Sequence, residues 1–337
     1  MLIENELIRK FSSGFDRSPQ QVNRLHEADA ELLRFNGGLL AFTVDGLSEE
    51  IESGLYEDPY LIGWMAITSS MSDLAAVGAS PRGVLLNLQV TSDLSEVWKG
   101  ELSRGIHEAC FRYQTYVLGG DTSVSANPSL ACFAFGEVGN SKAMTRRGGE
   151  AGDLVFGTGP FGNGNAIALE KLIYHASGFP YKPQARVDEG LFIRDYASSC
   201  IDTSDGLFPA LAQLAEINGF GYRLTEEAGQ LLSPQVVELA LHRKIPAWMF
   251  LAGPHGEFEL VFTIPAGRCE EFIGEADAFG FHPVCVGEIT KGPETTFVSE
   301  GRTFCVRMEE IANLFAESGQ DPVTYFNRLI KFDAYGK

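Results

Sequence analysis

Basic residues and long apolar runs are both scarce in this 337-residue chain. Lysine and arginine number 26 against 45 aspartates and glutamates, which gives a formal net charge of −19 at pH 7. Nucleic acids and anionic membrane surfaces attract clustered positive charge, so this balance argues against both as partners. No apolar run reaches the roughly 20 residues that a membrane-spanning helix needs. We therefore expect a protein that binds neither nucleic acid nor membrane.

Cysteine is sparse as well. The six cysteines are widely spaced and form no C-x-x-C pair. Such usage in a long chain is typical of reduced proteins inside the cell. The first residues, MLIENELIRKF, carry charges and lack the continuous apolar segment of a signal peptide. These absences together predict a cytoplasmic protein.

Several common active-site motifs are missing too. The chain has no G-x-x-x-x-G-K-[ST] loop, no H-E-x-x-H pair and no G-x-S-x-G elbow. A P-loop nucleotide site, a helical zinc site and a serine-hydrolase site are therefore not expected. The chemistry must depend on other side chains.

Apolar periodicity predicts an α/β unit in the first half of the chain. Strands are expected at 39–44, 84–90, 115–120 and 130–138, and helices at 60–77 and from about 93 to 112. A charged, glycine-rich segment at 145–153 then marks a boundary.

A second α/β unit follows this boundary. Helices are expected near 163–176, 187–199, 206–218 and 232–243, and strands at 154–159, 259–264, 283–289 and 303–307. We expect an N-terminal domain at 1–144 and a C-terminal domain at 145–308. A helical tail at 309–337 is expected to contribute nothing to the site.

Five aspartates lie at the ends of apolar segments or among small residues: Asp45, Asp73, Asp121, Asp202 and Asp205. Each alone could be a turn or a helix cap. Five such acids without partners would be costly, however. Carboxylates are ligands that Mg²⁺ prefers, and phosphoryl transfer needs metal ions on the phosphates. The aspartates therefore predict a magnesium site of the kind that phosphoryl transfer needs.

The order of these motifs resembles a superfamily that includes aminoimidazole ribonucleotide synthetase (PurM), selenophosphate synthetase and the thiamine-monophosphate kinases. The kinase pattern is the most similar one. It is matched by SDLAAVGASP (72–81), GGDT (119–122), the glycine-rich segment from Arg147 to Gly159, and IDTSDGL (201–207). The resemblance covers roughly residues 25 to 290.

This resemblance implies an α/β fold of two domains, ATP and Mg²⁺ as cofactors, and a homodimer. The N-terminal sheets of two copies would pair into a barrel, beside a C-terminal α/β sandwich domain. The implied metal ligands are Asp29, Asp45, Asp73, Asp121, Asp202 and Asp205. The implied ATP contacts are Thr43, Gly119, Gly120, Asp121, Arg147 and Ser204, and the implied catalytic residues are Asp121 and Asp205.

Three segments depart from the kinase pattern. The family's Gly-Asp-Asp-Ala-Ala signature reads Glu27-Ala28-Asp29-Ala30-Glu31, so only its second aspartate is kept. Its substrate-contacting Val-Glu-Gly-Val-His-Phe stretch is replaced by LSEEIESG (47–54), and its Gly-Gly-Glu-Asp-Tyr-Glu-Leu element by PHGEFEL (254–260). The acids of the first stretch could meet a cationic substrate, although a solvated loop is the simpler interpretation.

Three functions remain open at this point. The first is transfer of phosphate from ATP to thiamine monophosphate, which gives thiamine diphosphate and ADP. The altered substrate segments leave room for a second, an ATP-dependent ring closure of the aminoimidazole ribonucleotide synthetase type. The lost first aspartate of the signature leaves room for a third, a nucleotide-binding protein without catalysis.

Overall fold

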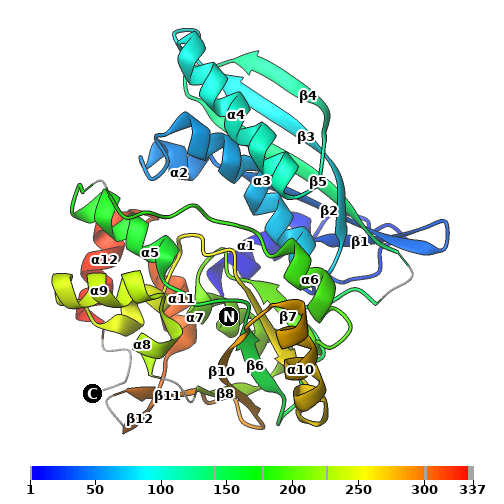
Figure 1. The fold of residues 1–337 in the computed structure, drawn as a ribbon, viewed down its shortest axis with the longest axis vertical. Coiled ribbons are helices and arrows are strands. Elements are labelled where there is room, and N and C mark those ends of the chain that lie inside the picture. Colours follow the sequence, from blue (N-terminus) through cyan, green and yellow to red (C-terminus); the bar gives the residue numbers. More distant parts are fainter. Residues whose placement is uncertain (1, 140–141, 177, 225–226, 300–301, 333–337) are drawn as a thin grey trace.

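The structure is a computed structural model that describes residues 2–139, 142–176, 178–224, 227–299 and 302–332. It contains two β-sheets, each with its own helices (Figure 1). The strands of the first sheet lie between residues 31 and 139, and those of the second between 154 and 305. No helix of the described ranges is long and apolar enough to cross a membrane.

The first sheet has five strands in the order β1-β2-β5-β3-β4. They are β1 (Glu31–Phe35), β2 (Gly38–Gly46), β3 (Ser80–Val90), β4 (Val117–Val124) and β5 (Ser129–Gly139). All neighbouring pairs are antiparallel except β3 and β4, which run parallel. Helices α3 (Pro59–Ala76) and α4 (Glu96–Arg112) lie on one face of this sheet, while the short α2 (Ser48–Glu52) follows β2 (Figure 1).

Helix α3 is the central helix of the first half. It begins at Pro59, where the Asp58 side chain accepts a hydrogen bond from the backbone N–H of Tyr60. Its residues are apolar or small on every side, so the helix is buried nearly all round. A Cβ at Gly63 would lie 2.2 Å from the Leu102 carbonyl oxygen of α4. Glycine at this position therefore allows the two helix backbones to come into close contact.

The second sheet has seven strands in the order β12-β11-β8-β10-β6-β9-β7. They are β6 (Leu154–Gly157), β7 (Ser199–Asp202), β8 (Gly221–Leu224), β9 (Leu260–Ile264), β10 (Val284–Thr290), β11 (Thr296–Ser299) and β12 (Arg302–Cys305). The helices of this half are α5 (Asn163–Ala168), α6 (Val187–Ile193), α7 (Leu207–Asn218), α8 (Ala228–Leu231), α9 (Pro234–Arg243) and α10 (Cys269–Phe279).

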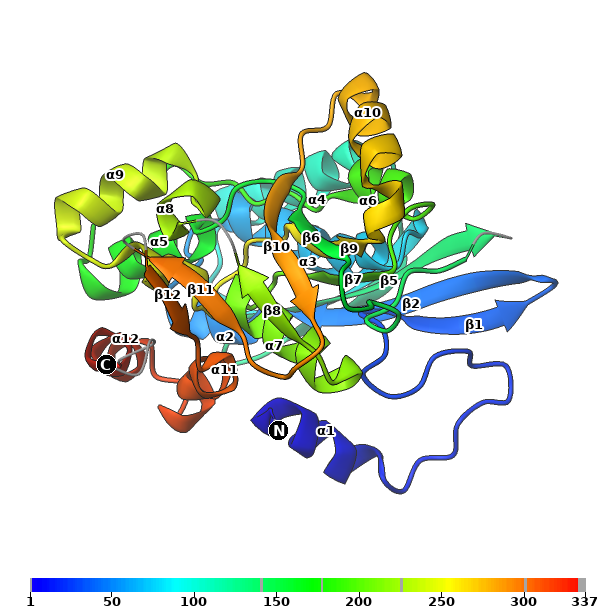
Figure 2. The same cartoon turned by 90° about the horizontal axis from the view of Figure 1, so that it is seen from below.

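Two of these helices cover opposite faces of the second sheet (Figure 2). On one face, Phe272 of α10 contacts the rings of Phe156 and Phe262. On the other, the hydroxyl of Tyr222 in β8 donates a hydrogen bond to the Leu211 carbonyl of α7, at 3.2 Å. Aromatic packing on one face and this hydrogen bond on the other thus fix the sheet whose β7 ends at the candidate site.

The two ends of the described chain meet beside this second half. Helix α1 (Ile3–Ser12) lies next to α11 (Met308–Glu317), and α12 (Pro322–Lys331) follows α11 (Figure 2). The backbone N–H of Ile3 donates to the Asn313 side chain at 2.9 Å. The N–H of Leu2 donates to Glu216 of α7 at 2.8 Å. The N-terminal helix is therefore held against the second half of the chain.

Most of the expected helices and long strands are confirmed, and several details are corrected. Strand β4 runs through Asp121 to Val124, so this aspartate lies inside a strand rather than after one. Helix α4 is capped by Ser95 instead of starting near 93. The expected helix at 163–176 continues from α5 into a π-helical turn at Leu169–Ile173, and that at 187–199 ends at Ile193. The short strands β1, β7, β8 and β11 were not expected.

Candidate functional site

Three aspartates from distant parts of the sequence form a compact cluster. Asp29 precedes β1, Asp73 lies in α3, and Asp202 ends β7. Each offers a carboxylate oxygen, and these oxygens all lie within 4.8 Å of one another. The segment before β1, helix α3 and the end of β7 therefore each supply one acid, so the site depends on both halves of the fold.

Hydroxyl groups orient two of the three carboxylates. Thr43 of β2 donates a hydrogen bond to Asp73. Ser72 donates to Asp202 at 2.7 Å, and Ser204 donates to the same side chain at 3.0 Å. These bonds fix the carboxylates in place without adding positive charge.

Among the described residues, one cation lies next to these acids, and it is the largely buried Arg146. Its guanidinium donates to Asp29 at 2.9 Å and to the Gln213 side chain at 2.8 Å. The predicted residue Arg147 instead pairs with Glu27, and its side chain is 53% exposed. Arg146 cannot be distinguished from Arg147 in the sequence, because two adjacent arginines offer no signal that separates them.

Burial, and then the neighbouring negative charges, raise the pKa values of Asp45, Asp73 and Asp202. Burial, and then the charges of Asp45 and Asp202, raise the pKa of Asp73 well above its usual range. Burial and the charge of Asp29 raise the pKa of Asp202 to about 7. Burial likewise raises the pKa of Asp45, the acid at the end of β2. A single arginine therefore does not balance the negative charge.

The chemistry of this cluster fits a divalent cation. One oxygen of Asp29 and one of Asp45 are buried with no hydrogen-bond partner among the described residues. Buried polar atoms are nearly always paired, so such oxygens need a ligand. The donors are all carboxylate oxygens, the set that Mg²⁺ prefers. We conclude that these residues fit Mg²⁺.

The raised pKa values predict how the stability of the metal-free protein depends on pH. Asp202 and Asp205 have pKa values of about 7 in the folded chain against an ordinary 3.8, so the folded state binds their protons more tightly than the unfolded state does. Their stabilising contribution is complete below about pH 4 and is lost as the pH rises through about 7.

We therefore expect the unfolding temperature in chelator to be higher at pH 5 than at pH 8, and Mg²⁺ to reduce this difference. Thermal unfolding followed by circular dichroism at several pH values measures it. A metal-free protein that becomes more stable between pH 5 and pH 8 would contradict the expectation.

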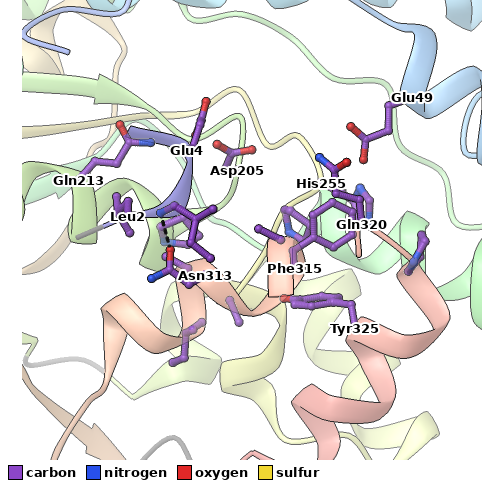
Figure 3. Close-up of a pocket in the computed structure, with 18 of the residues that line it drawn as sticks. Leu2, Glu4, Glu49, Asp205, Gln213, His255, Asn313, Phe315, Gln320 and Tyr325 are labelled. Carbon is purple, nitrogen blue, oxygen red and sulfur yellow. Dashed lines mark hydrogen bonds between the residues drawn. The ribbon is translucent and has the colours of Figure 1, made fainter. Parts of the chain in front are cut away.

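Asp205 connects the acid cluster to a larger pocket. A cavity of about 240 Å³ opens onto Asp29, Asp73, Asp202 and Asp205. A second cavity, of about 300 Å³, shares Asp205 and extends to α11 and α12 (Figure 3). Burial, and then the charges of Glu4 and Asp202, raise the pKa of Asp205 to about 7. This acid thus lies where the two cavities meet.

The sequence of this chain is similar to those of known proteins that share one family. Residues 27–138 match the model of the family described as AIR synthase related protein, N-terminal domain. The chain is 31% identical over 274 residues to the thiamine-monophosphate kinase of Pyrococcus abyssi, which covers 80% of this chain and 84% of that one. It is 34% identical over 242 residues to the thiamine-monophosphate kinase of Archaeoglobus fulgidus, and this match covers 70% of this chain and 77% of that one. The chain belongs to the thiamine-monophosphate kinase family.

The fold of the chain also resembles that of a solved structure from this family. The solved structure of AaThiL complexed with AMPPCP and TMP matches with a TM-score of 0.72 and 24% identity, over 88% of this chain and 92% of that one. The family resemblance and the mixed α/β fold of two domains, both predicted from the sequence, are confirmed.

The structure does not bring every predicted residue of this kinase-family site together. All eight residues of β4 are exposed, including Gly119, Gly120 and Asp121. Through the pairing of the strands, Asp45 of β2 lies in line with Gly120 of β4. Successive side chains of a strand point to opposite faces, so Asp121 points away from the face that carries Asp45. Two further strands also separate β4 from β2. A Cβ at Gly120 would lie 1.9 Å from the Leu86 carbonyl oxygen. Glycine is therefore needed here because β3 and β4 come into close contact, whether or not ATP binds. Within one chain, Asp121 lies apart from the acid cluster.

The tail, in contrast, lies beside Asp205. Residues from 309 onward are expected to contribute nothing to the site, yet Phe315, Gln320 and Tyr325 line the pocket that Asp205 shares. The three acids of the altered segment 47–54 lie in different places. Glu49 and Glu50 line this pocket, while Glu52 is exposed and lies outside it. Sequence reasoning missed the tail because its packing partners are distant in the chain.

Proposed function

We propose that the chain is a magnesium-dependent kinase that transfers the γ-phosphoryl group of ATP to thiamine monophosphate. The observation that carries this proposal is the cluster of Asp29, Asp73 and Asp202 with a single arginine, in a chain of the thiamine-monophosphate kinase family. The ligands named for AaThiL, AMPPCP and TMP, are an ATP analogue and this acceptor, and they support the same reaction.

The chain's own residues have distinct parts in this proposal. Asp29, Asp73 and Asp202 would hold Mg²⁺, with Asp45 and Asp205 at the edges of the site. A Mg²⁺ ion held by these residues would supply positive charge to offset that of the phosphates. Thr43, Ser72 and Ser204 orient the carboxylates by hydrogen bonds. The attacking group is a phosphate oxygen that is already an anion, so a strong base is not required.

Product analysis tests the reaction. We expect thiamine diphosphate and ADP to form in equal amounts from Mg-ATP and thiamine monophosphate, and chelation of Mg²⁺ to stop their formation. Released inorganic phosphate without thiamine diphosphate would favour a ring-closing enzyme. Thermal stabilisation by Mg-ATP without its consumption would favour a non-catalytic nucleotide-binding protein. Either of these outcomes contradicts the proposed kinase.

We further propose that two copies pair through the first sheet. Helices α3 and α4 lie on one face, and the rings of Phe42 and Phe133 stack on the other, where Val44 and Leu85 are exposed by 65% and 42%. An apolar sheet face of this kind is typical of an interface. Asp121, Gly119 and Gly120 lie on the exposed strand of this sheet, so their proposed roles in ATP and metal binding depend on this assembly.

Substitution on the exposed face tests the dimer. We expect sedimentation velocity to show a dimer, and Leu85→Glu to shift it to monomer, because a carboxylate would be buried in the interface without a partner. Phe111→Glu is the matched control, since Phe111 is 82% exposed on α4, away from this face. A monomeric wild-type chain would contradict the dimer, and so would a dimer that survives Leu85→Glu.

The proposed domains remain 1–144 and 145–308, with a tail at 309–337. In support, the strands of the two sheets fall on either side of the segment 142–153. Limited proteolysis that cuts first inside this segment would agree with the boundary, and first cuts within β2 to β5 would contradict it. We also propose a cytoplasmic location, where ATP is supplied, and fractionation of cells that produce the protein tests it.

A further inference from the structure

Helix α6 belongs to the second half of the chain by sequence, but it is fixed to the central helix of the first half (Figure 1). A Cβ at Gly190 of α6 would lie 2.4 Å from the Ala75 carbonyl oxygen of α3, so the two helix backbones are in close contact. The guanidinium of Arg194, just after α6, donates a hydrogen bond to the Gly78 carbonyl at 2.9 Å. Helix α6 is therefore held in place against α3, the helix that carries Asp73.

The segment before α6 is bound to the first half as well. The indole N–H of Trp64 in α3 donates to the Pro183 carbonyl at 2.6 Å. The backbone N–H of Ala185 donates to the Tyr113 hydroxyl at 3.0 Å, and this hydroxyl lies 3.0 Å from a hydroxyl of α3. All three bonds are buried. The next residue, Arg186, is therefore attached to the first half of the fold.

The side chain of Arg186 extends into the second half and pairs with Glu259, the residue before β9. Its Nε donates to one carboxylate oxygen at 2.8 Å, and its Nη2 donates to the other. The Thr158 hydroxyl donates to the same carboxylate at 2.6 Å. The side chains of Arg186 and Glu259 are 29% and 8% exposed, so solvent screens this pair little. A two-pronged ion pair of this kind fixes the direction of both side chains.

The backbone of Glu259 holds the turn that carries Asp202. Its carbonyl oxygen accepts hydrogen bonds from the backbone N–H of Thr203 at 2.8 Å and from the hydroxyl of Thr203 at 3.0 Å. Asp202 itself is paired with Leu260 across strands β7 and β9. The ion pair therefore connects α3 with the strand and the turn that position Asp202.

We propose that Arg186 and Glu259 are positioning residues for the acid cluster. Their ion pair sets the distance between Asp73 and Asp202, and thereby the affinity of the cluster for a divalent cation. The inference rests on the metal site of the proposed function. Ser72 bonds the Asp202 carboxylate directly, whereas the ion pair holds the backbones from which the two carboxylates project. Mg²⁺ demands a nearly ideal arrangement of its ligands, so a small displacement should weaken its binding.

Direct binding of Mn²⁺ tests the proposal without turnover. Mn²⁺ takes the same oxygen ligands as Mg²⁺. The EPR signal of free Mn²⁺ is lost on binding, so a titration of the full chain without ATP gives the dissociation constant. We expect Glu259→Gln and Arg186→Gln each to weaken Mn²⁺ binding at least fivefold, because either change leaves a buried charge without its partner and releases the turn.

The two single variants separate position from charge. If the residues acted only through their charge, Glu259→Gln would weaken cation binding and Arg186→Gln would strengthen it. A positioning role makes both variants bind more weakly. Arg186→Lys keeps the charge but cannot form the two-pronged pair, so it should also bind Mn²⁺ more weakly than wild type. The double variant has no unpaired charge, and it should bind more tightly than either single variant.

Arg243 and Glu170 form a matched control pair. The Nε and Nη2 of Arg243 each donate to the Glu170 carboxylate at 2.8 Å, and the two side chains are 24% and 11% exposed. Both residues lie in the second half, so this pair does not connect α3 with β9. Glu170→Gln should therefore lower the unfolding temperature about as much as Glu259→Gln does, and leave the dissociation constant for Mn²⁺ within twofold of wild type.

A positioning role has to appear in both single variants. Mn²⁺ affinity within twofold of wild type in both, or tighter binding in Arg186→Gln, overturns it. An equal loss of Mn²⁺ affinity in Glu170→Gln also overturns it, because a general loss of stability would then explain the effect. A wild-type chain that binds no Mn²⁺ overturns the metal site and this inference with it. A chain that binds Mn²⁺ as expected but makes no thiamine diphosphate supports the positioning role and overturns the proposed reaction instead.

Discussion

Asp73→Asn is expected to reduce ATP-dependent turnover by about a hundredfold to a thousandfold, the range seen when one charge-stabilising group is removed from an active site. Asp73 is the acid of α3 within the cluster, and it lies within 4.8 Å of Asp29 and Asp202 through carboxylate oxygens. Asparagine keeps an oxygen that can accept the hydrogen bond from Thr43. The substitution therefore removes charge while it preserves shape.

The same substitution should stabilise the metal-free protein. Asp73 is buried among like charges, and its raised pKa shows that the ionised form is disfavoured in the folded chain. Removing that charge relieves repulsion, so we expect the unfolding temperature in chelator to rise by several degrees. A lower activity together with a higher stability distinguishes a metal ligand from a residue that only supports the fold.

Turnover of thiamine monophosphate and thermal unfolding in chelator measure the two effects. Asp93→Asn is the control, since Asp93 is exposed in the loop before α4 and should change neither quantity. If Asp73→Asn kept turnover within threefold of wild type, Asp73 would have no part in the metal site. If it lowered the unfolding temperature, the repulsion inferred from the pKa would be absent.

The parts of the fold that the sequence predicts are those with strong local signals. Helix α3 has a proline at its start, a long apolar run and a glycine soon after its end, so its bounds were expected within about one residue. The acids Asp73 and Asp202 are recognisable because each interrupts an apolar segment. Short strands such as β7 and β8, of four residues each, contain too few residues to show a period.

The parts that the sequence could not predict depend on contacts between distant segments. Nothing in the sequence distinguishes Arg146 from Arg147, because only the folded chain places one beside Asp29 and the other beside Glu27. The tail looked separate since its partners, α1 and residues 252–255, lie far away in the chain. The sequence likewise gave no sign that Asp121 and Asp45 would point to opposite faces of one sheet.

Substitution of Arg146, but not of Arg147, should cause a large loss of stability. Arg146→Gln is expected to destabilise the metal-free chain by about 3 kcal/mol, because breaking a buried ion pair leaves an uncompensated charge. The Asp29 side chain is 1% exposed and that of Arg146 is 15% exposed, so water cannot replace the lost partner. Arg147→Gln removes a pair in which the arginine is 53% exposed, and it should cost less than about 1 kcal/mol.

Magnesium should affect the stability of the two variants differently. A divalent cation at Asp29 supplies the positive charge that Arg146→Gln removes, so the loss of stability should shrink when Mg²⁺ is added, whereas that of Arg147→Gln should not change. Urea unfolding with chelator and with Mg²⁺ measures all four values. Equal losses for the two variants, or a loss in Arg146→Gln that Mg²⁺ leaves unchanged, would show that Arg146 does not balance the acid cluster. A smaller loss with Mg²⁺ would mean that arginine and metal neutralise the same carboxylates.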